Sequence, residues 1–218
     1  MTTFPNSPKL LKGGIVLIDP ETANVQRIIS LQYNPESLSR TLQVQGAGER
    51  GDRSEALRLK GPAVETIKLD AEIDATDQLE FPDQNPNAVE LGIQPQLAVL
   101  EMLVHPPSSQ LNSNNQLAQS GVLEIVPMET QLALFVWSKN RIVPVRITDF
   151  SITEEAFDTG LNPIRAKVSL GMRVLSVDDL GFQHKGGALF LSYLQNKEQL
   201  ANKAMPGSFS TLGIGGIP

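Results

Sequence analysis

Apolar and polar residues alternate most regularly between residues 142 and 175, and this pattern predicts two long strands joined by a turn. The second strand alternates over about eleven residues, roughly twice the usual length, and at ~3.3 Å per residue it reaches about 35 Å. We expect one face in a core and one charged face, an arrangement suited to assembly with other subunits. The core face contains Ile164, Ala166, Val168, Leu170, Met172 and Val174, and the charged face contains Arg165, Lys167 and Arg173.

The first strand of this ribbon changes the face on which its apolar side chains lie. Its early apolar residues lie at odd positions, at Val143, Val145 and Ile147. Its later ones lie at even positions, at Phe150 and Ile152. A shift by one residue near Asp149 predicts a β-bulge, which would twist the ribbon.

Shorter patterns predict the remaining elements. Five further strands are expected, at residues 14–18, 26–33, 37–45, 65–74 and 132–137, and Lys139-Asn140 marks the turn into the ribbon. Arg40 interrupts the inward face of its strand, so we expect it near an end or an interface. Helical spacing predicts a helix that starts at Pro95 and ends before His105, and a second, amphipathic helix over residues 189–204.

Three segments are predicted to lack regular structure. Residues 46–63 form a long glycine-rich loop, residues 108–120 a polar linker rich in Asn and Gln, and the last residues a flexible tail. The fold class is therefore mainly β (α+β). We expect a β domain over residues 1–178, with loops at 46–63 and 105–120, and a C-terminal helix and tail over residues 179–218.

Composition narrows the functional classes. The chain has 218 residues, 40% hydrophobic and 19% charged, which is typical of a soluble globular protein. A net charge of −6 argues against nucleic-acid binding, because phosphates require a basic surface. The absence of cysteine excludes disulfides and thiolate chemistry. No signal peptide and no apolar run of membrane-spanning length is evident, so we expect cytoplasmic synthesis and no direct membrane insertion.

The densest chemical cluster is acidic: Asp70, Glu72, Asp74, Asp77 and Glu80. These carboxylates match no calcium-loop spacing, although a cation site or a carboxylate pair for glycoside chemistry stays an alternative. We favour the polar face of one strand, which could meet the cations of the ribbon on a neighbouring strand. The two histidines belong to no recognisable triad or zinc site. We predict no catalytic residue, no metal and no cofactor, and no enzymatic activity.

Three stretches together resemble the tube-like proteins of contractile injection systems, the phage-tail-like particles of bacteria. The sequence LQYNP at residues 31–35 is similar to an FNP-type segment of that family, with Tyr33 where phenylalanine is commoner. ETIKLD at residues 65–70 is similar to the family's next strand, and VPVRI (143–147) with NPIRA (162–166) is similar to its long paired strands. The resemblance covers about residues 12–178.

This resemblance implies a tail-tube fold, in which two packed antiparallel sheets form a small barrel flanked by a helix. It also implies a hexameric ring around a channel. The chain looks closest to the baseplate adaptor, or tube initiator, that joins a trimeric spike to the inner tube, although the LysM module of many such adaptors is absent here. Expected partners are further copies of the chain, the trimeric spike or hub protein, the inner-tube protein, and baseplate or sheath components.

Two alternatives stay open: a repeating inner-tube subunit, and a carbohydrate-binding module or hydrolase. The candidate interface residues come from the glycine-rich loop, the acidic strand and the basic strand. They are Arg50, Arg53, Arg58 and Lys60; Asp70, Glu72 and Asp74; and Arg165, Lys167 and Arg173.

Overall fold

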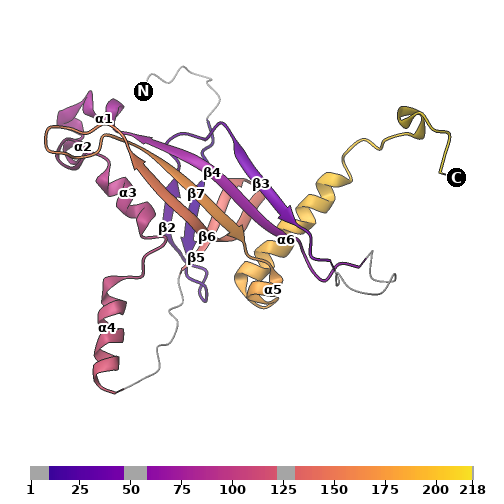
Figure 1. Cartoon of the computed structure of the whole chain (residues 1–218), viewed down its shortest axis with the longest axis horizontal. Coiled ribbons are helices and arrows are strands. Elements are labelled where there is room, and N and C mark those ends of the chain that lie inside the picture. The colour runs from indigo at the N-terminus through magenta and orange to yellow at the C-terminus, as the bar shows by residue number, and fades with distance from the viewer. Residues whose placement is uncertain (1–9, 47–57, 122–130, 218) are drawn as a thin grey trace.

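Seven antiparallel strands form one hydrogen-bonded sheet at the centre of the molecule (Figure 1). The computed structural model describes residues 10–46, 58–121 and 131–217. The mainly-β, α+β prediction is confirmed. The spatial order is β2-β1-β5-β6-β7-β4-β3. The strands are β1 (Gly14–Ile18), β2 (Val25–Ser30), β3 (Leu38–Gln43), β4 (Val64–Asp74), β5 (Leu132–Ser138), β6 (Arg141–Glu154) and β7 (Arg165–Val174).

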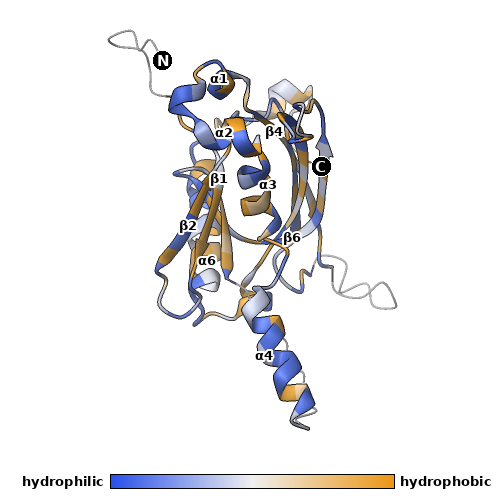
Figure 2. Ribbon diagram, turned by 90° about the vertical axis from the view of Figure 1, so that its left-hand side faces the viewer, coloured by the Kyte–Doolittle hydropathy of each residue, from blue (hydrophilic) through white to orange (hydrophobic). Residues whose placement is uncertain are grey.

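The architecture differs from the expected one in one respect. The strands form one sheet and not two packed sheets. Strand β5 pairs with β1 on one side and with β6 on the other, and so joins the two halves. The sheet bends, and helix α3 (Gln94–Glu101) lies between its β1–β2 part and its β4–β6 part (Figure 2). One helix thus fills the space that a second sheet would occupy.

The β6–β7 ribbon follows the predicted pattern closely. Alternate residues of β7 are buried, and Val168 and Met172 have no exposed surface. The register between the two strands shifts between Ile147 and Asp149, which confirms the predicted bulge. Because of this shift, Ile147 and Phe150 both pack against the core despite their opposite parity.

Helices cover the inner face of the sheet and one of its ends. Leu97 and Leu100 of α3 join the main core, as do Phe190 and Tyr193 of α6. Helices α5 and α6 lie at the end of the sheet where β7 finishes (Figure 1). The helices are α1 (Thr76–Leu79), α2 (Pro86–Leu91), α3, α4 (Ser108–Gln119), α5 (Val177–Leu180) and α6 (Lys185–Ala201), with 3₁₀ turns η2 (Pro82–Gln84) and η3 (Phe209–Leu212). The last of these lies within the predicted flexible tail.

The prediction of an irregular linker at residues 108–120 is wrong, because these residues form helix α4. The helix has no buried residue and extends away from the sheet (Figures 1 and 2). Its sequence contains neither glycine nor proline and includes several good helix formers, Gln, Leu and Ala. The polar composition excluded a core helix but not an exposed one.

The loop between β6 and β7 is fixed against the start of α3. The amide of Ile93 donates to the carbonyl of Pro163 at 2.8 Å, and the side-chain amide of Asn162 donates to the carbonyl of Glu90 at 3.0 Å. Gly92 has φ +58°, and a Cβ there would lie 2.1 Å from the carbonyl oxygen of Pro163, so only glycine fits. These contacts hold the loop against α2 and the start of α3.

Candidate functional site

The predicted acidic and basic faces lie side by side on the outer face of the sheet, within one chain. Strands β4 and β7 are neighbours, and their register places three polar pairs opposite one another. These pairs are Asp70 with Ser169, Glu72 with Lys167, and Asp74 with Arg165. The acidic side chains of β4 and the basic side chains of β7 therefore come together within one subunit, and this arrangement does not by itself require a partner.

Each cation of β7 has an acidic partner. Arg165 Nε lies 2.7 Å from Asp74 Oδ2, Lys167 Nζ lies 3.0 Å from Glu155 Oε1, and Arg173 Nη2 lies 2.7 Å from Asp179 Oδ1. The hydrogen bonds to Asp74 and Glu155 raise the pKa of Arg165 and Lys167. Exposed pairs of this kind contribute only about 0–1 kcal/mol to stability. These three cations are therefore neutralised within the subunit, and their ion pairs add little to the free energy of folding.

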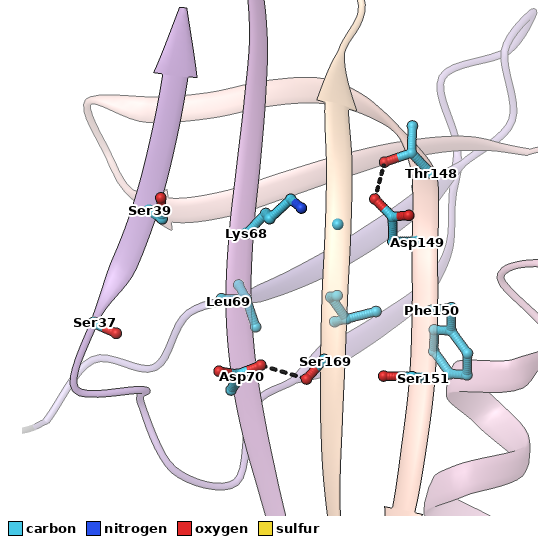
Figure 3. A pocket seen from close by; sticks show the side chains of 12 residues that line it. Ser37, Ser39, Lys68, Leu69, Asp70, Thr148, Asp149, Phe150, Ser151 and Ser169 are labelled. Carbon is cyan, nitrogen blue, oxygen red and sulfur yellow. Dashed lines mark hydrogen bonds between the residues drawn. The ribbon is translucent and has the colours of Figure 1, made fainter.

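A depression of about 670 Å³ opens on this outer face (Figure 3). Gly171 forms part of its floor and has no side chain, and Asp149 leans over it from the bulge of β6. Ser169 donates to Asp70, and Thr148 donates to Asp149. The lining residues are Ser37, Ser39, Lys68, Leu69, Asp70, Thr148, Asp149, Phe150, Ser151, Ser169, Leu170 and Gly171.

The chemistry of this depression suits contact with a polar surface. It presents hydroxyl groups, one ammonium group and two carboxylates, and its one aromatic residue, Phe150, packs against the core. Among the described residues, no three His, Asp or Glu side chains come close enough together to hold a metal ion. The arrangement can accept and donate hydrogen bonds over a broad area.

The remaining candidate residues lie apart from the acidic strand. Arg58 and Lys60 are exposed on a segment held to the chain before it, where the amide of Lys60 donates to the carbonyl of Gln45 at 2.9 Å. This segment is at the end of the sheet where β4 begins. Arg50 and Arg53 lie outside the described residues.

A buried charge cluster on the inner face was not predicted. Glu65 is 3% exposed and accepts hydrogen bonds from Arg40 Nε at 2.6 Å, Lys197 Nζ at 3.0 Å and the Tyr193 hydroxyl at 3.1 Å. Arg40 also donates to the Tyr193 oxygen at 3.0 Å. Arg40 was expected near an end or an interface; it lies within edge strand β3, and its side chain joins β3 to Tyr193 of α6. The overlooked signal was Glu65, a carboxylate at an inward position of β4.

The cations control the protonation of Glu65. Burial alone would raise the pKa of this carboxyl, but the hydrogen bonds and charges of Arg40 and Lys197 outweigh burial and leave the pKa below its ordinary value. Glu65 is therefore charged at neutral pH and fixes α6 on the sheet.

Strands β2 and β3 are the two edges of the sheet, and among the described strands neither has a second neighbour. Both edges expose apolar side chains, with Ile28 of β2 70% exposed and Leu42 of β3 51% exposed. An open edge offers unpaired backbone groups to another chain. These edges are the part of the sheet best suited to contact between subunits.

The LQYNP segment, residues 31–35, has a structural role in this chain. Leu31 is buried in the core, while Gln32 exchanges two hydrogen bonds with the backbone of Asp74, at 2.7 and 3.0 Å. Asn34 accepts from the amide of Gly13 at 2.9 Å and donates to the carbonyl of Leu11 at 2.8 Å. The segment joins the end of β4 to the start of β1, and its Tyr33 side chain is half-exposed.

Comparison with solved structures gives remote likenesses, of which two are described here. No family model matches the chain, and no curated protein matches it. The chain is similar to a protein in the tail of an empty gene transfer agent particle with C6 symmetry, at 13% identity and TM-score 0.28, over 75% of this chain and 90% of that one. It is also similar to a protein in the virion of a native gene transfer agent particle, at 12% identity and TM-score 0.26, over 74% and 90%. TM-scores of this size do not establish a common fold.

Proposed function

We propose that this chain is a structural subunit of a contractile injection particle. Six copies form a ring in the baseplate that joins the trimeric spike or hub to the inner tube and so initiates the tube. The subunit is made in the cytoplasm, works inside the assembled particle and catalyses no reaction. The sequence resemblance over about residues 12–178 supports this proposal, together with the arrangement of the sheet.

The observation that carries the proposal is a curved sheet whose two edge strands have no second neighbour among the described strands. Strands β2 and β3 lie at opposite ends of the strand order, so β2 of one subunit can pair with β3 of the next. A head-to-tail contact of this kind closes into a ring when the rotation between neighbours is an integral fraction of a turn. The same pairing would cover the exposed apolar side chains of both edges.

Electron microscopy of the purified protein, alone and with its spike and inner-tube neighbours, tests this proposal. We expect six-fold rings in top views and a ring bound to a trimer when the spike protein is added. Ile28→Lys and Leu42→Lys, which place a charge on each edge, should reduce the rings to monomers with an unchanged circular dichroism spectrum. Lysine at a sheet edge opposes strand pairing.

Leu111→Lys on α4 is the matched control, because Leu111 and Leu42 are both 51% exposed and only Leu42 lies on an edge. This control should retain rings. Monomers under every condition, or rings that persist in both edge variants, would overturn the proposal.

A repeating inner-tube subunit is the second candidate, and one observation favours it. The end where β4 finishes exposes carboxylates on α1, α2 and the turn between them: Asp77, Glu80, Asp83 and Glu90. The end where β4 begins exposes the cations Arg58, Lys60 and Lys185, and opposite charges at the two ends suit stacking of identical rings. Particle copy number separates the candidates, since a repeating subunit is present far more than about six times per particle.

A further inference from the structure

The segment that follows helix α6, residues 202–217, is exposed at every position. Its one charged residue is Lys203. Exposed apolar side chains gathered in this way mark a surface that contacts another molecule. We call residues 205–217 the apolar segment. Its large apolar side chains are Met205, 95% exposed, Phe209, 48%, Leu212, 72%, Ile214, 46%, and Ile217, 80%.

The apolar segment has local structure although the sheet does not cover it. Turn η3 (Phe209–Leu212) is capped by Ser208, whose hydroxyl oxygen accepts from the amide of Thr211 at 3.3 Å. The amide of Ile214 donates to the carbonyl of Phe209 at 3.1 Å and closes the turn. Side chains three residues apart lie on the same side of a 3₁₀ turn, so Phe209 and Leu212 project together. A preformed turn of this kind loses little conformational freedom on docking.

Helix α6 brings the apolar segment to the β3 edge of the sheet. Arg40 of β3 donates to the hydroxyl oxygen of Tyr193 at 3.0 Å, and Arg40 and Lys197 both donate to Glu65. The helix continues past the end of β3, and the apolar segment extends farther in the same direction (Figure 1). Strand β2 lies on the other side of the molecule (Figures 1 and 2). The segment therefore points away from its own β2 edge.

The β2 edge carries an apolar surface that the helices of its own subunit leave open. Ile28 pairs with Val16 and Val25 pairs with Ile18, and paired side chains of antiparallel strands lie on one face. Val16 and Ile18 belong to a small core that side chains of β5, α5 and α6 complete. Ile28 is 70% exposed and Val25 58% exposed, so this core is open toward β2. We call Val25 and Ile28 the β2 patch.

In the proposed ring, the β2 patch of one copy lies across the boundary from β3 and α6 of its neighbour. Pairing places β2 and β3 side by side, but their side chains project out of the plane of the sheet, so a further element is needed to cover that face. Fully extended, residues 202–217 span roughly 50 Å, which is about ten strand spacings of ~4.8 Å. The apolar segment of the neighbour is therefore long enough to reach the patch.

We propose that the apolar segment of one copy docks on the β2 patch of the next copy in the ring, with Phe209 and Leu212 as its anchors. This inference rests on the proposed ring and names a further contact that holds the ring closed. The apolar segment carries no charge, so its burial requires no desolvation of an ionised group. The contact is heterologous, because the two surfaces differ, and it repeats at each boundary until the ring closes.

Removing the anchors tests the proposal. In the triple variant Phe209→Ser, Leu212→Ser and Ile214→Ser, rings should need at least about tenfold more protein to assemble, because buried apolar anchors dominate the stability of a contact. Sedimentation velocity over a dilution series measures this concentration. Circular dichroism and the melting temperature should be unchanged, because these side chains lie outside the sheet. The matched control replaces three half-exposed apolar residues at the end of α3 and on α4 and should assemble as the wild type: Met102→Ser, Leu111→Ser and Leu117→Ser.

Cross-linking identifies the copy that accepts the segment. The chain has no cysteine, so single cysteines can be introduced without competing thiols. Ile28→Cys and Leu212→Cys are prepared separately, mixed as monomers in equal amounts, assembled and treated with a short bifunctional maleimide. We expect covalent dimers in the mixture and none in either variant alone. Leu117→Cys in place of Leu212→Cys is the control and should give no dimer.

The outcomes separate this inference from the ring on which it rests. Rings of the triple variant as stable as those of the wild type, or a mixture that forms rings without cross-linked dimers, would overturn the inference and leave the proposed ring intact. A cross-link found only within the double variant Ile28→Cys and Leu212→Cys would assign the segment to its own β2 patch and would also overturn it. Loss of spike binding in the triple variant, with ring stability unchanged, would assign the segment to the spike instead. A wild type that forms no ring at any concentration would overturn the proposed function itself.

Discussion

The two faces of strand β4 carry charged residues of the same types in opposite surroundings. On the outer face, Asp74 pairs with Arg165, whose side chain is 43% exposed. On the inner face, the side chain of Glu65 is 3% exposed and has three partners. Solvent screens the outer pair, whereas the inner carboxylate would be left unpaired in an apolar environment if its partners were removed.

This difference separates the residues that hold the fold from those available for assembly. The outer pairs can exchange one partner for another at little cost, because water stabilises each charge when it is unpaired. The inner cluster cannot, because the core provides no alternative hydrogen bonds. Substitutions on the inner side should therefore change stability, and substitutions on the outer side should change association.

The largest effect is expected from Val168→Asp. Val168 has no exposed surface, and an unpaired carboxylate there should cost more than about 4 kcal/mol, a large part of the stability of a domain. Thermal and urea unfolding followed by circular dichroism measure the loss. Thr153→Asp is the control, because this exposed position lies across from Lys167 and should leave the melting temperature nearly unchanged.

Glu65→Gln is expected to have an intermediate effect. It keeps the size of the side chain and one acceptor oxygen, so one of the two hydrogen bonds to Arg40 and Lys197 is lost. A hydrogen bond to a charged group is worth about 1.5–3 kcal/mol, so we expect a loss of about 2 kcal/mol. Glu72→Gln, on the exposed face of the same strand, should stay within about 0.5 kcal/mol of the wild type. Equal losses in the two variants, measured by urea unfolding, would remove the distinction between the faces.

The pH dependence of unfolding of the wild type and of Glu65→Gln shows whether the charge of Glu65 stabilises the protein. Its pKa in the folded protein lies below its ordinary value, which is about 4.3 in an unfolded chain. The cluster therefore stabilises the protein above about pH 4.3, and this stabilisation is lost as the pH falls through the lower, folded pKa. The gap in stability between the wild type and Glu65→Gln should narrow on acidification. A gap independent of pH would show that the charge of Glu65 contributes nothing.

The smallest effect on stability is expected from Arg165→Glu. The exposed pair with Asp74 is lost and two carboxylates become neighbours, which should cost about 1 kcal/mol. The subunit should stay folded by circular dichroism, while six-fold rings seen by electron microscopy become fewer. Arg165→Gln removes the ion pair without reversing the charge. Its stability and its number of rings should lie between those of the wild type and of Arg165→Glu. Unfolding comparable to that of Val168→Asp would mean that the ribbon serves only the core.

The sequence predicted the strands well because local patterns determine them. The first strand was expected at residues 14–18 and is found at Gly14–Ile18, and the bulge near Asp149 follows directly from the change of parity in β6. Helix α4 was missed because its polar residues suggested a linker. Burial identifies core helices, but an exposed helix needs only favourable backbone preferences. The candidate residues of the outer face were found by their parity, whereas the residues of the buried cluster were not recognised as a group.

The sequence by itself determined which side chains face inward on each strand, since a period of two residues is a local property of extended chain. Only the tertiary structure decided which strands became neighbours. Asp74 and Arg165 are 91 residues apart, and Glu65 and Lys197 are 132 residues apart, and no local pattern brings either pair together. Pairing of β4 with β7 and docking of α6 do so, because the same apolar faces must be buried at once. That packing left β2 and β3 as the two edges of the sheet among the described strands.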